Sequence, residues 1–162
     1  IEKLSWFNKE YISKVDSEHL LSQLSNMNSG FSEDEYSLSV LELIRDRCSL
    51  MNDFSKESEY FFNEVEDYDS KAVNKFINEQ AVNLLTELLE ELKNITSWKS
   101  HDIQLSIEQI LSKHEVGFGK IGLPLRIALT GSTNSPSIDK TAEVLGRKVV
   151  IERIDKAIKV FS

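Results

Sequence analysis

The chain has 162 residues, 40% of them hydrophobic and 28% charged, a balance that excludes a disordered chain. No apolar run approaches the roughly 20 residues of a membrane span, and one cysteine, Cys48, excludes an internal disulfide. The net charge of −8 argues against indiscriminate nucleic-acid binding, but it is uneven: residues 1–112 carry −12 and residues 113–162 carry +4. The basic part can form a local phosphate-facing surface, although ordinary basic helix ends explain the same charges.

Other features of the composition bear on location and architecture. The chain has no basic-then-apolar signal peptide, and its cysteine usage fits a reducing compartment, so we expect a cytoplasmic protein. It begins at Ile1 and not at methionine, which suggests a piece of a longer protein. Two prolines and six glycines favour long helices over a turn-rich β protein.

The first part of the chain is expected to form short helices. Residues 1–15 carry apolar side chains at helical spacing, and Ser17 can cap a second helix whose inner face includes Met27. Acidic residues after Ser32 favour the start of a third helix, because they face the positive end of its dipole. Ser55 can cap a fourth helix, which carries an aromatic cluster.

A run rich in acids at residues 64–69 interrupts this pattern. We therefore predict two subdomains, residues 1–66 and residues 67–162. Ser70 is expected to open the clearest helix, in which apolar residues recur at spacings of three and four as far as Leu92.

The last part continues with helices after a loop at 95–99. Ser100 is expected to begin a helix, and residues 123–129 form a buried one after a glycine-rich connection. Pro136 is suited to a first helical turn, and Gly146 is a natural helix end before a last amphipathic helix. No run alternates with a period of two, so the predicted fold is all-α.

No catalytic or metal site is predicted from the residues. Residues 117–122 match the G-x-G-x-x-G fingerprint, but that motif works between a strand and a helix, and here a helix precedes it. Three histidines and one cysteine are widely spread and lack metal-ligand spacing, and the acid pairs fit solvated helix faces. Cys48 has no recognisable nucleophile signature, so we expect a buried thiol.

Two arginines near the end of the third predicted helix are candidate ligand-binding residues. Arg45 and Arg47 lie two apart, so their side chains point about 200° apart on a helix and cannot both serve one ion pair. One of them can bridge Glu42 or stabilise the helix end, which leaves the other to meet a ligand. Arginine suits a base edge because its planar fork makes two hydrogen bonds at once. The aromatic cluster at 60–62 can stack on bases, although this spacing beside leucines is more typical of a core.

Residues 124–132 resemble the P-L-R-x-A-L-T-G-S segment near the end of bacterial-type glutamyl-tRNA synthetases. The resemblance continues through Pro136 and Gly146 into the final helix. Near the start, Lys3, Leu4 and Trp6 belong to a segment similar to the K-L-x-W-x-N-x-x-Y-I motif of those enzymes, and residues 45–47 resemble their R-x-R helix end.

The resemblance implies an all-helical anticodon-binding region of two packed subdomains, an α-helix cage. The parent would be a class I synthetase that activates glutamate with ATP and Mg and transfers it to tRNA. The H-I-G-H-like and K-M-S-K-S-like motifs of the catalytic domain are absent here, so this piece is expected to bind RNA without aminoacylating it. The implied partner is glutamate tRNA, and some family members charge glutamine tRNA as well. We expect a monomer that holds no cofactor or metal itself and binds neither membrane nor DNA.

Individual roles also follow from the resemblance. Arg47 matches the arginine that reads the third anticodon base, a cytosine in glutamate tRNA. Ser135, Pro136 and Ile138 match the segment that contacts the first two bases, and Arg126 matches an arginine near them. Anticodon bases are single-stranded, so they can be stacked and hydrogen-bonded on their edges. Two other readings stay open, a helical protein-interaction module that ignores RNA and a stand-alone enzyme.

Overall fold

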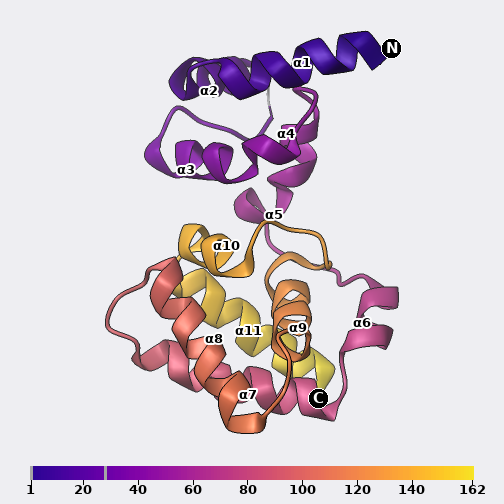
Figure 1. Ribbon diagram of the computed structural model, residues 1–162, viewed down its shortest axis with the longest axis vertical. Coiled ribbons are helices and arrows are strands. Elements are labelled where there is room, and N and C mark those ends of the chain that lie inside the picture. Colours follow the sequence, from indigo (N-terminus) through magenta and orange to yellow (C-terminus); the bar gives the residue numbers. More distant parts are fainter. Residues whose placement is uncertain (1, 28) are drawn as a thin grey trace. The chain divides into compact units, whose positions relative to one another are not determined.

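The computed structural model describes residues 2–27 and 29–162, and for residues 2–7 it describes the backbone alone. The side chains of Lys3, Leu4 and Trp6, which carry part of the predicted motif, therefore lie outside the described residues. The described secondary structure consists of eleven α-helices and one 3-10 helix without a strand, which confirms the all-α prediction. The chain divides into two compact units, Ile1–Glu64 (unit 1) and Val65–Ser162 (unit 2) (Figure 1).

Unit 1 is built from short helices around an aromatic and aliphatic core. In chain order they are α1 (Glu2–Lys14), α2 (Ser17–Asn26), α3 (Glu35–Ile44), the 3-10 helix η1 (Arg45–Arg47), α4 (Asp53–Glu57) and α5 (Glu59–Phe62). Leu20 and Leu24 of α2 and Val40, Leu41 and Ile44 of α3 are fully buried against each other's helices. Burying such side chains stabilises the unit by about 1.5–3 kcal/mol each, before the entropic cost of ordering the chain.

Three local predictions for unit 1 are wrong. The cap of α2 is Asp16, whose carboxylate accepts hydrogen bonds from the N–H groups of Glu18 and His19, so Ser17 is already helical. Met27 is 46% exposed and does not join the apolar face. Ser55 lies inside α4 and does not cap a helix.

Unit 2 is a bundle of longer helices. They are α6 (Ser70–Phe76), α7 (Glu79–Asn94), α8 (Ser100–His114), α9 (Gly119–Thr130), α10 (Ile138–Leu145) and α11 (Arg147–Phe161). Helix α11 packs on α7 and α9, while α8 packs on α7 and α10 (Figure 1). The core is almost wholly aliphatic, with Leu85, Leu88 and Ile107 among its fully buried members.

The predicted helix from Ser70 to Leu92 is two helices. Helix α6 ends at Phe76, and α7 begins after Asn78, whose side-chain oxygen accepts a hydrogen bond from the N–H of Ala81 at 2.8 Å. The apolar spacing continues across this break, but α6 buries Ala72 alone, whereas α7 buries a full stripe from Ala81 to Leu92.

The other two differences in unit 2 concern where helices begin. Pro136 lies outside α10, which begins at Ile138, so the prediction of a first-turn proline is wrong. Helix α9 begins at Gly119, so four of the six residues of the glycine-rich stretch 117–122 are helical and do not form a connection.

Within residues 2–27 and 29–162, no helix is both long enough and apolar enough to cross a membrane. The same residues contain no group of three or more histidine, cysteine, aspartate or glutamate side chains that could hold a metal ion.

Candidate nucleic-acid interface

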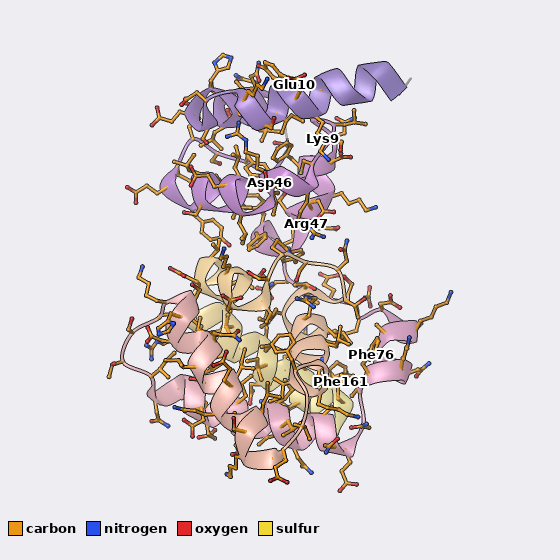
Figure 2. The ribbon with its side chains drawn as sticks, in the orientation of Figure 1. Lys9, Glu10, Asp46, Arg47, Phe76 and Phe161 are labelled. Atoms are coloured by element: carbon orange, nitrogen blue, oxygen red, sulfur yellow. The ribbon has the colours of Figure 1, made fainter. Side chains whose placement is uncertain are left out.

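The candidate base-reading residue Arg47 lies in unit 1, in the single turn of η1 that continues α3. The turn ends at Cys48, whose N–H donates to the carbonyl of Arg45 at 3.1 Å and whose side chain is buried. This buried residue fixes the end of the turn in the core. Arg47 and its neighbour Asp46 are both exposed on the surface beside it (Figure 2).

The two arginines of η1 have different partners, as their predicted divergence requires. Arg45 bonds the end of α1 and the start of α2 and not Glu42: its Nε donates to the carbonyl of Ile12 (2.7 Å), its Nη1 to Ser17 Oγ (3.0 Å) and its Nη2 to the carbonyl of Val15. A cation near the last carbonyls of a helix is stabilising, because these carbonyls have no partner within the helix. Arg45 is therefore a structural residue of unit 1.

Arg47 is held by Glu57 of α4. Its Nε donates to Glu57 Oε2 at 2.8 Å, and the two side chains are 29% and 17% exposed. The pair is partly covered by protein, so it lies at the edge of the surface and not in open solvent. Glu57 therefore orients the guanidinium of Arg47.

The thiol next to this pair is inert. Burial, followed by the nearby carboxylates of Glu57 and Asp53, raises the pKa of Cys48 to about 12. A cysteine with so high a pKa carries almost no thiolate at neutral pH, and the thiolate is the reactive form. Cys48 is the buried thiol that we expected.

The remaining predicted residues lie in unit 2, where α9 ends and a polar loop leads to α10. The chain turns at Gly131, which has a positive φ of 82°, and its N–H donates to the carbonyl of Ile127 at 2.8 Å. Thr130 Oγ1 donates to the carbonyl of Arg126 at 2.8 Å and lies 3.1 Å from the carbonyl of Ser132. The loop is thus organised by its own hydrogen bonds from its first residue.

Arg126, Ser135 and Pro136 are brought together in this loop. Arg126 Nε donates to Ser135 Oγ at 2.8 Å, and Ser135 Oγ donates to the carbonyl of Pro136 at 2.9 Å. All three residues are half-buried, so each keeps part of its surface open to solvent. Ile138, by contrast, is 1% exposed, so its side chain belongs to the core and only its backbone borders the loop.

Sequence reasoning missed one residue of this region, Arg153 of α11. It is 7% exposed, and its Nη1 donates to the carbonyl of Leu129 at 2.7 Å. A signal was present, because Arg153 stands on the buried stripe of α11 together with Val150, Ile154 and Ala157. A charged residue at such a position calls for a buried partner.

The sequence also matches a known family model, the anticodon-binding domain, over residues 2–158. The chain belongs to this family. The match covers both units and agrees with the resemblance found in the end motifs.

Solved structures of glutamate–tRNA ligases are similar over nearly the whole chain. One is a glutamate tRNA ligase from Elizabethkingia meningosepticum, in complex with its amino acid, with 28% identity, a TM-score of 0.90 and coverage of 99% of this chain. Another is the glutamate-tRNA synthetase from Elizabethkingia anophelis, with 29% identity, a TM-score of 0.83 and coverage of 98%. The chain spans 32% and 31% of the length of those proteins.

Proposed function

We propose that this chain is the anticodon-binding region of a glutamate–tRNA ligase, with its two units as the two anticodon-binding subdomains. The observation that carries the proposal is the similarity of the whole chain to about a third of two such ligases. The ligase would be longer than this chain, and its ATP, Mg and aminoacylation chemistry would belong to its other part. The region described here would bind glutamate tRNA and have no activity alone.

Arg47 is the proposed reader of the third anticodon base. The Watson–Crick edge of cytosine offers two adjacent acceptors, O2 and N3, which suit the parallel donors of a guanidinium. Guanine presents two donors at the corresponding positions, so it would meet the cation with like polarity. The surface position of Arg47 on η1 and the orientation that Glu57 gives its guanidinium support this role. Whether glutamine tRNA, with a different third base, is also accepted depends on this discrimination.

The loop between α9 and α10 is the proposed contact for the first two bases. The hydroxyl of Ser135 donates to the carbonyl of Pro136, and Arg126 holds that hydroxyl in place, so the loop presents a fixed set of polar groups. Ile138 would contribute its backbone at the start of α10, because its side chain is buried. Polar groups of this type are suited to the edges of splayed bases.

A binding titration with the anticodon stem-loop of glutamate tRNA tests the proposal. We expect specific binding that weakens steeply as salt rises, because phosphate contacts release counterions. A stem-loop of the same length with an unrelated anticodon is the control, and we expect it to bind more weakly at every salt concentration. Equal binding of the two RNAs, or none by the folded chain, would contradict the proposal and favour a protein-interaction module.

A further inference from the structure

Among the residues whose burial the structure describes, Arg153 is the one charged residue that is buried, and it contacts the end of α9. Removing a charge from water is costly unless it is compensated by hydrogen bonds, so a buried arginine needs well-placed acceptors. The carbonyl of Leu129, 2.7 Å from its Nη1, is in the last turn of α9 and has no partner within the helix. Arg153 therefore holds the carbonyl of Leu129, two residues before the turn at Gly131.

The other side of the same turn is also held. The carbonyl of Gly131 accepts a hydrogen bond from the N–H of Asp69 at 2.8 Å. A Cβ atom at Gly131 would lie 2.8 Å from the carbonyl oxygen of Asp67, so the segment 65–69 packs directly on the turn. Only glycine combines the positive φ with this close approach.

Helix α11 also holds that segment. Lys156 is one turn after Arg153, and its Nζ donates to the carbonyl of Val65 at 2.7 Å. Helix α11 thus holds two parts of the chain around this turn. Arg153 binds the residue before the turn, and Lys156 binds the segment 65–69 that packs on it. The loop that begins at Gly131 and carries Ser135 departs from this anchored point.

We propose that Arg153 is a positioning residue for the loop between α9 and α10, and that it sets discrimination at the first two anticodon bases without touching RNA. The inference rests on the proposed function of that loop. Arg47 lies in unit 1 and has its own support from Glu57, so its discrimination at the third base does not depend on Arg153. The selective effect on two of three bases separates a positioning role from a general loss of stability.

The test compares Arg153→Met with wild type in the 162-residue chain. Each protein is titrated with the cognate stem-loop and with stem-loops changed at one anticodon base at a time. We expect the preference for the cognate base to fall about tenfold at the first and second positions and to stay within twofold at the third. Arg153→Lys, which keeps a cationic donor, should recover most of the lost preference.

Arg147→Met is the matched control. Arg147 lies on the same helix and also donates to a backbone carbonyl, that of Ile95 at 2.7 Å, but Ile95 is the C-cap of α7 and is not part of the loop between α9 and α10. We expect Arg147→Met to leave the base preference at all three anticodon positions unchanged, even if the variant lowers the midpoint of urea unfolding. If Arg153→Met does not fold, Arg153→Gln takes its place with the same expected outcome.

Unchanged preferences in a folded Arg153 variant would overturn the inference while leaving the proposed function intact. An equal loss at all three positions would also overturn it, because that is the result of a purely structural role. A wild-type chain that binds no stem-loop would remove the proposed function and this inference together.

Discussion

Arg126 and Ser135 are joined by a hydrogen bond of 2.8 Å from Nε to Oγ, and Ser135 passes a second bond to the carbonyl of Pro136. This chain of bonds connects the last turn of α9 to the loop that precedes α10. The serine thus accepts from a cation and donates to the backbone, so its hydroxyl orientation is fixed.

The first prediction is that Arg126 and Ser135 act as a unit in RNA binding. Arg126→Met and Ser135→Ala should each weaken binding of the cognate stem-loop, and the double variant should lose less than the sum of the two. Residues in direct contact show coupling energies of about 0.5–3 kcal/mol in such a cycle. Ser112→Ala, at an exposed position of α8, is the control and should leave binding unchanged. Strict additivity of the two losses would show that the hydrogen bond does not matter for binding.

The second prediction concerns Glu57, which orients Arg47. Glu57→Gln keeps the shape of the side chain but removes a negative charge, so we expect somewhat tighter RNA binding with a reduced preference for cytosine. The loss of preference should be smaller than that caused by Arg47→Ala, and the free energy of unfolding should change by less than about 1 kcal/mol. Stem-loop titrations and urea unfolding measure the two effects.

Glu59→Gln is the control for Glu57, since it removes the same charge from an exposed position of α5. It should change affinity in the same direction without altering the preference for cytosine. Weaker RNA binding by Glu57→Gln would indicate instead that Glu57 itself contacts the RNA.

The third prediction tests the break between α6 and α7. Asn78→Ala removes the side-chain acceptor for the N–H of Ala81 and should lower the free energy of unfolding by about 1 kcal/mol. Asn74→Ala, at an exposed position inside α6, should have a much smaller effect. Urea unfolding followed by circular dichroism distinguishes the two, and equal effects would argue against the cap.

The fourth prediction is a pH dependence from Glu143. The N–H of Ser100 at the start of α8 donates to this carboxylate and, as the largest cause, lowers its pKa below the usual 4.5. Because the folded pKa is the lower one, the stabilisation is complete above pH 4.5 and is lost as the pH falls through the folded pKa. The difference in unfolding free energy between wild type and Glu143→Gln should therefore be largest near neutral pH and shrink towards about pH 3.

Glu152→Gln, at an exposed position of α11, is the control for Glu143. The difference in unfolding free energy between wild type and Glu152→Gln should depend less on pH. If the difference in unfolding free energy between wild type and Glu143→Gln is constant between neutral pH and about pH 3, the stabilising role of the Glu143 carboxylate is contradicted.

The sequence was a good guide to the helices and a poorer guide to where they end. The apolar spacing of three and four continues from Val73 through Ala81 to Leu92, so periodicity alone could not reveal the break at Asn78. The competing signal was local: an asparagine can cap a helix with its side chain, and here that bond prevails over continuation. The cap at Asp16 was missed for a similar reason, since the serine that follows it is an equally good cap by composition, whereas α6 does begin at Ser70 as predicted.

The site was predictable only in part. The motifs selected Arg126, Ser135 and Pro136 together, and these three do lie together in the structure. The residue pattern alone did not separate the roles of Arg45 and Arg47, because the partners of Arg45 are carbonyls some 30 residues away in the sequence. The family resemblance was what assigned base reading to Arg47. A contact with backbone groups leaves no pattern in the side chains, and the same applies to Arg153 and the carbonyl of Leu129.

The most direct test of the central claim is a titration of wild type and Arg47→Ala with two stem-loops of glutamate tRNA, one cognate and one with guanine at the third anticodon base. We predict that wild type prefers cytosine and that Arg47→Ala loses about 1–3 kcal/mol of that preference, while its salt dependence changes little. A wild-type preference that Arg47→Ala leaves unchanged would contradict base reading by Arg47, and equal binding of both stem-loops by wild type would contradict it as well.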